Sequence, residues 1–424
     1  MVMKEIYALV DCNNFFVSCE RVFNPELKNK PVVVLSNNDG CAISRSNEAK
    51  DLGIPMGAPM FKYQSLIKKH HIQLFSTNFV LYGDISNRVM KILAEFTPDL
   101  EIYSIDEAFL SLKGINKDLT EYCKNIRKTI LKWTGIPISI GIGPTKTLAK
   151  AANKLVKKNP KFNGVLNLIN NSQIDELLNQ LDVGDVWGVG RKYTKFLLTS
   201  GIYTALGLKE AHSKWIKEKM TIMGARTQQE LRGDNCSHLE IAEKPRKSIL
   251  FSRSFGKPQE SLKDLSEAVS YFTSAAAEKL RKYKLVASLM TVFVSTNKFK
   301  KNEPKYFNGI NFCLSVATSY TPELINYSLE GLKKIYRGGY QYKKAGVIML
   351  GLIPENKLQL NLFCNHPSSS NNRLMKVYDG INKKWGGGTI KYVSDGINRP
   401  WSMRQSNKSL RFTTHWDELL KIQI

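Results

Sequence analysis

Residues 104–109, Ser-Ile-Asp-Glu-Ala-Phe, place two adjacent carboxylates inside an apolar run. A run of this kind predicts a buried strand, and charged side chains rarely stay buried there without a partner. Because neighbouring side chains of a strand point to opposite faces, Asp106 and Glu107 reach one cation only near a bend or a strand end. The alternative interpretation is a hairpin tip with two solvated acids.

A third acid, Asp11, ends another apolar run at residues 6–10. Three carboxylates on two adjacent strands suit Mg²⁺, which prefers oxygen ligands and takes the rest of its shell from water and substrate phosphates. The second acidic strand therefore favours a magnesium site over a solvated hairpin.

The composition bounds the class of protein. A chain of 424 residues predicts three or four domains, and 42% hydrophobic with 23% charged residues is typical of a soluble globular protein. No apolar stretch is long enough to span a membrane, and seven scattered cysteines without a CxxC pair predict reduced thiols in the cytoplasm. The net charge of +25 indicates a polyanionic partner, nucleic acid before membrane.

The order of elements around the acids predicts an α+β layer of ferredoxin-like type. A strand at residues 4–10 is followed, after an intervening segment, by a helix at 79–97 and the acidic strand pair at 100–112. A helix at 119–133 and a Gly-ended strand at 138–143 complete the layer. Both acid sites then lie on neighbouring strands.

Basic side chains follow two of the expected strands. After the strand at 31–35, a helix is predicted that carries Arg45 and Lys50 and has Ser44 at its start, a combination that suits phosphate binding. A solvated helix face is the alternative. A second helix is predicted to open within residues 144–150 and to continue through 158. It carries several lysines directly behind the Gly-ended strand, which favours a phosphate contact from one of them.

The second half of the chain has features of DNA binding. Residues 186–191, Val-Trp-Gly-Val-Gly-Arg, resemble the turn of a helix-hairpin-helix, which offers backbone N–H groups to a DNA phosphate. Residues 236–246 are interpreted as a linker. Residues 244–355 hold 19 Lys and Arg against 8 Asp and Glu around helices at 262–282 and 322–336, which predicts a DNA-gripping domain.

Three motifs, taken in order, resemble those of the Y-family translesion DNA polymerases, and the resemblance extends along the whole chain. They are DCNNFFVSCE at residues 11–20, SIDEAF at 104–109, and GIG followed by KTLAK within 141–150. The tail is similar to that of the UmuC branch, the catalytic subunits of bacterial DNA polymerase V, through GGT at 387–389, WSMR at 401–404 and RFTT at 411–414.

The resemblance implies roles for individual residues. Asp11, Asp106 and Glu107 would hold two Mg²⁺ ions, with the carbonyl of Cys12 completing the coordination shell of the second ion. Phe16 would be the steric gate, whose ring lies under the sugar and excludes a 2′-hydroxyl. The implied nucleotide contacts are Phe15, Phe16, Ser44, Arg45, Lys50 and Lys157, and the implied DNA contacts are Gly188, Gly190, Arg191 and Arg253.

The resemblance also implies a division into domains. These are a palm at 1–11 and 78–165, fingers at 12–77, a thumb at 166–242, a little finger at 245–355, a linker at 356–373 and a UmuC-type C-terminal domain at 374–424. Within the linker, Gln359, Leu360, Leu362 and Phe363 resemble the peptide by which bacterial polymerases dock on the sliding clamp. The alternative is that these apolar side chains fold back onto their own domain.

The implied function is error-prone, template-directed DNA synthesis across damaged template by a two-metal mechanism, as in SOS mutagenesis. The implied partners are primer–template DNA, dNTP, a UmuD-type accessory protein, RecA and the sliding clamp, without a membrane. A catalytically inactive DNA-binding scaffold of a repair complex is the alternative, but it has no need for three acids and a gate aromatic. A nucleotidyl cyclase would not need the basic domain or the hairpin.

Overall fold

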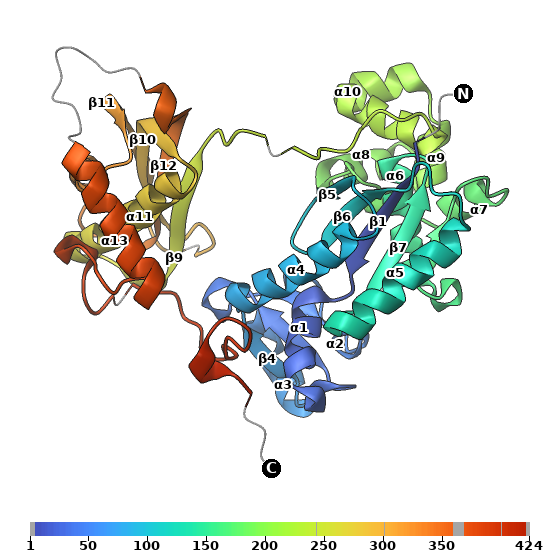
Figure 1. The fold of residues 1–424 in the computed structure, drawn as a ribbon, viewed down its shortest axis with the longest axis horizontal. Coiled ribbons are helices and arrows are strands. Elements are labelled where there is room, and N and C mark those ends of the chain that lie inside the picture. The colour runs from blue at the N-terminus through green and yellow to red at the C-terminus, as the bar shows by residue number, and fades with distance from the viewer. Residues whose placement is uncertain (1–4, 243, 301, 359–368, 400, 421–424) are drawn as a thin grey trace. The chain divides into compact units, whose positions relative to one another are not determined.

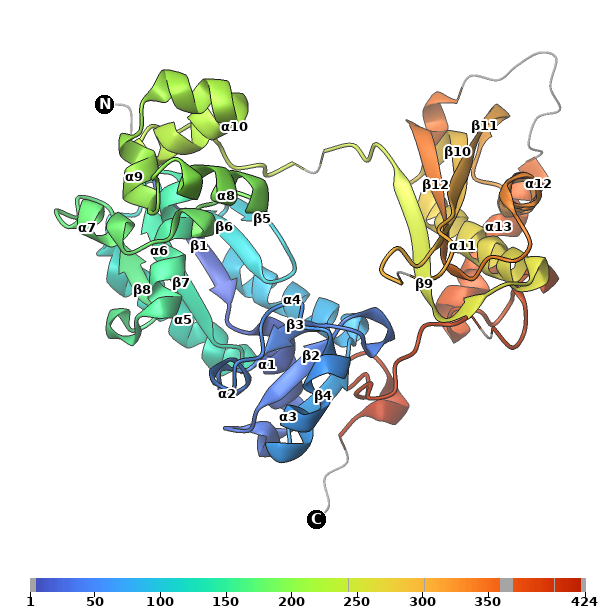
Figure 2. The same cartoon turned by 180° about the vertical axis from the view of Figure 1, so that it is seen from behind.

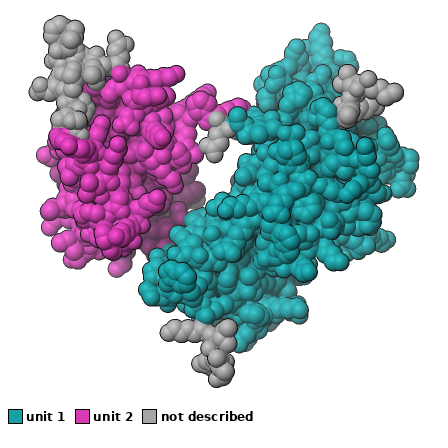
Figure 3. Space-filling model, viewed as in Figure 1, with its two compact units in different colours: residues 1–36, 40–243, 407–424 teal, residues 37–39, 244–406 magenta. Residues whose placement is uncertain are grey.

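The structure is a computed structural model that describes residues 5–242, 244–300, 302–358, 369–399 and 401–420 (Figure 1, Figure 2). Two compact units make up the chain. One consists of Met1–Ser36, Gly40–Glu243 and Asn407–Ile424, and the other of Asn37–Asp39 and Lys244–Ser406 (Figure 3). None of the described helices combines the length and apolar character needed to cross a bilayer.

A five-stranded sheet is the centre of the first unit, with the strand order β5-β6-β1-β7-β8. Strand β1 is flanked by β6 and β7, and it is antiparallel to both. The strands are β1 (Tyr7–Cys12), β5 (Leu100–Ile102), β6 (Glu107–Ser111), β7 (Ile138–Gly143) and β8 (Val165–Asn167). The strands expected around both acid motifs are therefore present and adjacent.

Helices cover both faces of this sheet. The alternate side chains Ala8 and Val10 of β1 join a core with α4 (Phe79–Ala94) and α5 (Leu119–Thr134). Helix α6 (Lys146–Lys158) lies on the opposite face, which the other alternate residues of β1 form. All three helices agree with the sequence expectation to within a few residues.

A small three-stranded sheet, ordered β3-β2-β4, lies between β1 and α4 in the sequence. Arg45 is the last residue of β3 and Ser46 caps the following helix α2, so the expectation that Arg45 lies on the helix is wrong. The chain is still extended at Arg45, because the Ser46 hydroxyl accepts the Ala49 N–H and starts the helix there. The elements are α1 (Phe15–Phe23), β2 (Val32–Leu35), β3 (Ala42–Arg45), α2 (Asn47–Asp51), α3 (Gln64–Lys69) and β4 (Gln73–Ser76).

A helical cluster completes the first unit and is tied to the start of α6. The carboxylate of Glu230 accepts the backbone N–H of Thr147 at 2.9 Å, and the Thr145 hydroxyl donates to the Glu230 carbonyl at 2.9 Å. A carboxylate at a helix N-terminus is favoured by the free N–H groups there. The helices are α7 (Ile174–Asn179), α8 (Arg191–Thr199), α9 (Ala205–Glu210) and α10 (Ser213–Arg232).

The second unit is a four-stranded antiparallel sheet, ordered β11-β10-β12-β9, with helices packed on it. Helix α13 (Ser369–Trp385) is held there through Asp379, whose carboxylate accepts two hydrogen bonds from Arg281 at 2.6 and 2.8 Å. The other elements are β9 (Ile249–Gln259), α11 (Leu262–Lys282), β10 (Leu285–Thr296), β11 (Phe307–Thr318), α12 (Thr321–Ile335) and β12 (Tyr342–Pro354).

The C-terminal stretch 374–424 is divided between the two units. Trp401 belongs to the hydrophobic core of the second unit, whereas residues 407–424 belong to the first. The α+β class expected from the sequence is confirmed. The assignment of the parts to palm, fingers, thumb and little finger stays a prediction.

Candidate active site

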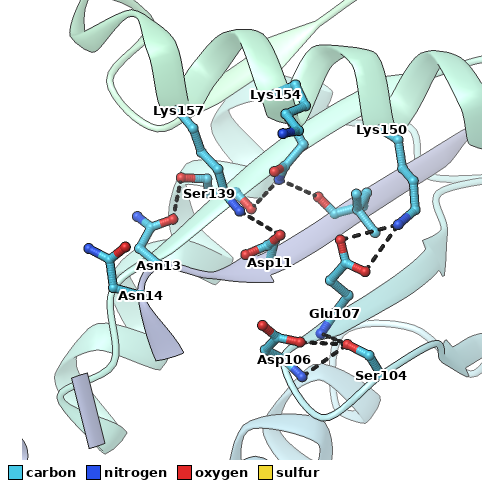
Figure 4. A network of polar contacts seen from close by, with 12 residues as sticks. Asp11, Asn13, Asn14, Ser104, Asp106, Glu107, Ser139, Lys150, Lys154 and Lys157 are labelled. Carbon is cyan, nitrogen blue, oxygen red and sulfur yellow. Dashed lines mark hydrogen bonds and ion pairs between the residues drawn. The ribbon is translucent and has the colours of Figure 1, made fainter. Parts of the chain in front are cut away.

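The three acids of the sequence motifs lie at the ends of two paired strands. Asp11 on β1 is directly opposite Glu107 on β6, and the backbone N–H of Cys12 donates to the Asp106 carbonyl at 2.9 Å. Ser104 shapes the turn before β6: its hydroxyl donates to Asp106 Oδ1 at 2.6 Å and accepts the Glu107 N–H at 3.0 Å. The strand-end position anticipated from the sequence lets adjacent acids project near one another (Figure 4).

Helix α6 carries lysines that reach these acids (Figure 4). Lys157 Nζ lies 2.5 Å from Asp11 Oδ2, and Lys150 Nζ lies 3.0 Å from Glu107 Oε2. The ammonium group of Lys150 also lies over the ring of Tyr103, 4.3 Å from its centroid. Two lysines about two turns apart on one helix face therefore meet the acids of two neighbouring strands.

The carboxyl of Asp11 has a raised pKa. Burial raises the pKa of its carboxyl to about 6, the Lys157 ammonium group opposes that rise, and Glu107 and Asp106 add to it. Desolvation disfavours the charged form, and like charges nearby act in the same direction. A further cation beside Asp11 would favour its ionised form.

The donor chemistry fits Mg²⁺. Within the described ranges, no three His, Cys, Asp or Glu side chains are gathered closely enough to hold an ion by themselves. Asp11 and Glu107 are instead paired with lysines, and Mg²⁺ characteristically takes a few carboxylate oxygens together with waters and substrate phosphates. Cys12 has its thiol in the core, where burial raises the thiol pKa, so the carbonyl is the group it can offer.

A cavity of about 590 Å³ borders Asp11 and Asp106. Lys50 lines it from α2, and its Nζ donates to Asn14 Oδ1 at 2.6 Å and to Asn47 Oδ1 at 3.1 Å. Burial, with the nearby charges of Arg45 and Lys157, lowers the pKa of Lys50. The lining includes Asp11, Asp106 and every residue expected to contact the nucleotide: Phe15, Phe16, Ser44, Arg45, Lys50 and Lys157.

The sequence motifs missed some of this lining. Asn14 and Asn47 position Lys50, and Lys154 and Arg127 also border the cavity. The position of Asn14 between Asp11 and Phe16 could have indicated it, because every residue of that turn is close to the site. Arg127 carried no such signal, since it lies on α5 and only the packing of α5 brings it to the cavity.

The expected DNA-contact residues lie outside this cavity lining. Gly190 caps α8 and Arg191 is its first residue, while Gly188 has φ +89° in the turn before it. Arg253 is exposed on β9 of the second unit, with its guanidinium over the Phe251 ring at 4.7 Å. Residues 359–363, with the expected clamp peptide, lie outside the described residues.

Models of known protein families match three parts of the chain. The profile of the impB/mucB/samB family matches residues 10–154, that of its C-terminal domain matches 246–362, and a domain of unknown function matches 372–422. Protein UmuC of Salmonella typhimurium is 42% identical over 99% of this chain and 100% of its own. Protein ImpB of Salmonella typhimurium is 39% identical over 98% of this chain and 99% of its own.

The chain belongs to the impB/mucB/samB family. More distant relatives of this family member include DNA polymerase IV of Picrophilus torridus, 29% identical over 74% of the chain and 92% of the relative. Among solved structures, a chimera of the Y-family DNA polymerases Dbh and Dpo4 has a TM-score of 0.63 at 20% identity, covering 82% of this chain and 99% of its own. The UmuC-type, Y-family DNA polymerase assignment made from the motifs is confirmed.

Proposed function

We propose that this family member adds dNTPs to a primer 3′ end by copying a DNA template, including positions with damaged bases. The observation that carries the proposal is the cavity in which Asp11 and Asp106 meet Phe16 and the cations of Lys50 and Lys157. Nucleotidyl transfer needs acids that bind metal ions and cations that bind the phosphates. A ring beside them can contact the sugar.

The carboxylates of Asp11, Asp106 and Glu107 are proposed to hold two Mg²⁺ ions, with the Cys12 carbonyl as a further ligand. Bound Mg²⁺ supplies acidification of the primer hydroxyl and neutralisation of charge on the departing pyrophosphate. Ser104 keeps Asp106 in place through a 2.6 Å hydrogen bond. The chain's own contribution is to present these oxygens from rigid strand ends.

The basic side chains of the cavity are proposed to bind the triphosphate. Lys157, now paired with Asp11, lies beside the acids, where its ammonium group would contact a phosphate oxygen of the nucleotide. Lys50 is held by Asn14 and Asn47, and Arg45 and Ser44 lie on the neighbouring strand end. Fixed cations around a phosphate stabilise negative charge as the bond to the leaving group breaks.

Phe16 is proposed to select the sugar. Its ring lines the cavity that Asp11 borders, and a rigid ring beneath the sugar leaves no room for a 2′-hydroxyl. Phe15 lies beside it, with ring centroids 5.7 Å apart. The two rings would thus form the surface of the cavity that contacts the nucleotide.

The remaining parts are proposed to bind DNA without reading its sequence. The turn at Gly188 and Gly190 presents the N-terminus of α8, with Arg191, to a phosphate. The second unit, with Arg253 exposed on β9, is proposed as the little finger that grips the duplex through its excess of Lys and Arg. The other domain names carry over in the same way: palm for the five-stranded sheet, fingers for the three-stranded sheet and thumb for the helical cluster.

The biological setting is proposed from the relatives. A UmuC-type chain would work in SOS mutagenesis in the cytoplasm, with a UmuD-type accessory protein and RecA. The sliding clamp would bind Gln359, Leu360, Leu362 and Phe363. A tether of this kind raises the effective concentration of a polymerase at the primer end.

Primer extension tests the proposal against the alternative of an inactive DNA-binding scaffold. The assay uses a template with an abasic site, with and without partners, and compares Asp106→Ala with Asp99→Ala, an exposed acid just before β5. Asp106→Ala is expected to abolish nucleotide addition while DNA binding is retained, and Asp99→Ala to behave as wild type. Wild-type protein that binds DNA without extending any primer, under all these conditions, would establish the scaffold instead.

A further inference from the structure

The C-terminal tail docks on the first unit beside the three-stranded sheet. The Ser76 N–H, at the end of β4, donates to the Asn407 carbonyl at 2.8 Å, and the Asn407 N–H donates back to the Ser76 hydroxyl at 3.0 Å. Further along, the ring of Phe412 stacks on that of Phe23, with centroids 4.9 Å apart and an interplanar angle of 13°. Backbone pairing and ring stacking thus hold the tail at two points.

Asn78 connects this tail to helix α4. Its side chain is fully buried, and its Nδ2 donates to the Ser409 carbonyl at 3.1 Å, the Ser409 hydroxyl at 3.0 Å and the Leu410 carbonyl at 3.1 Å. Its Oδ1 accepts the Leu81 N–H at 3.4 Å as the cap of α4. One amide therefore fixes both the tail and the start of the helix.

The tail also reaches a buried acid, Glu20 on α1, which is 2% exposed. Its Oε1 accepts hydrogen bonds from the Tyr82 hydroxyl at 2.6 Å and the Ser409 hydroxyl at 2.9 Å. Burial raises the pKa of Glu20, and the two hydroxyl donors oppose that rise. Because a buried acceptor is costly to leave unsatisfied, Ser409 and Tyr82 are held together through this one oxygen.

Tyr82 in turn supports the sugar-selecting ring. Its ring stacks on Phe16, with centroids 4.7 Å apart and an interplanar angle of 15°. Phe79 of the same helix meets Phe16 edge-on at 5.9 Å. The ring that faces the cavity is thus backed by α4, and the hydroxyl of its backing residue is fixed by Glu20.

We infer that the C-terminal tail is a positioning element for sugar selection, acting from Ser409 through Glu20 and Tyr82 on Phe16. The inference rests on the proposed role of Phe16 as the gate and assigns a role to part of the domain of unknown function. Phe16 excludes a 2′-hydroxyl only if its ring cannot move away from the sugar, and Tyr82 is the ring that packs behind it. Tyr82 is held by Glu20, and the tail supplies, through Ser409, one of the two hydrogen-bond donors to that carboxylate.

Ribonucleotide discrimination measures this coupling. Ser409→Ala is expected to raise kcat/KM for rNTP relative to dNTP by about 3- to 10-fold, as expected for losing one hydrogen bond of ordinary strength. The change should lie mainly in KM for rNTP, with dNTP efficiency within about twofold of wild type. Tyr82→Phe, which keeps the ring and loses the hydroxyl, should shift the ratio in the same direction.

Controls separate positioning from general loss of structure. Ser409→Thr keeps the hydroxyl and should restore the wild-type ratio, and Thr414→Ala, at an exposed position of the same tail, should not change it. Phe16→Ala should raise the ratio further than any of these. Adding Ser409→Ala to Phe16→Ala should then have no additional effect, because both act through the same ring.

The outcomes distinguish the two proposals. If Phe16→Ala leaves the ratio unchanged, the gate assignment fails and the coupling fails with it. If Phe16→Ala raises the ratio but Ser409→Ala and Tyr82→Phe do not, only the tail's role is overturned. An equal loss of rNTP and dNTP efficiency in Ser409→Ala, together with a lower melting temperature, would also overturn it in favour of a purely structural tail.

Discussion

A methyl group at Gly141 should disrupt the packing that brings the lysines of α6 to the acids. A Cβ at this position of β7 would lie 2.2 Å from the Ala149 carbonyl oxygen and 2.3 Å from the Asn153 backbone nitrogen. Both are backbone atoms of α6, so neither can rotate away, and the whole helix must shift. Overpacking of this kind costs about 1–3 kcal/mol, and two backbone contacts place Gly141→Ala at the upper end.

Gly83→Ala is the matched control, because the Cβ it would add in α4 meets nothing within 4 Å beyond the adjoining residues and the backbone of its own helix. Replacing a glycine in a helix interior by alanine stabilises the folded protein by about 0.5–1 kcal/mol. In a unit of this size, thermal unfolding should therefore show Tm lower by roughly 5–10 °C for Gly141→Ala and slightly higher for Gly83→Ala. Primer extension should fall only for Gly141→Ala. A Gly141→Ala protein that melts at or above the wild-type temperature would refute the close-packing argument.

Three further predictions concern charge and partners. Since burial raises the pKa of Asp11 to about 6, above its unfolded value, the metal-free protein should become more stable as pH falls from above 6 toward 4. Unfolding free energies measured across that range should show the gain in wild type. Asp11→Asn should show a smaller gain, because the pKa of the buried Glu20 is also raised and still contributes. DNA affinity should fall steeply with salt and vary little with template sequence, and binding constants that ignore salt would contradict phosphate contact. Leu362→Ala with Phe363→Ala should remove stimulation by the sliding clamp and leave basal extension intact, whereas equal loss of basal activity would mean that both are core residues.

Local patterns were enough to predict the elements that carry the site. The apolar runs before Asp11 and around Asp106 predicted strands β1 and β6, and both are present and paired. Helix α11 runs over Leu262–Lys282, as its periodicity predicted. Such elements follow from side chains within a few residues of one another, so the order of residues alone reveals them.

The orientation of basic side chains was predicted less completely. The lysine-bearing helix behind β7 was expected to supply a phosphate contact, and Lys157 does line the cavity. Its ion pair with Asp11 was not anticipated. That pair depends on how closely α6 approaches the sheet, which the absence of side chains at Gly141 and Gly143 permits.

Contacts between segments that are far apart in the chain could not be predicted from the sequence. The tail was expected to be one small domain, yet Ser409 donates to Glu20, 389 residues away, while Trp401 packs in the other unit. Short motifs reveal which residues the chain carries for chemistry, because that chemistry needs particular side chains at close spacing. Which far segment satisfies a buried acid such as Glu20 is decided by the shape and hydrogen-bond geometry of the folded surface, and these exist only once the chain has packed.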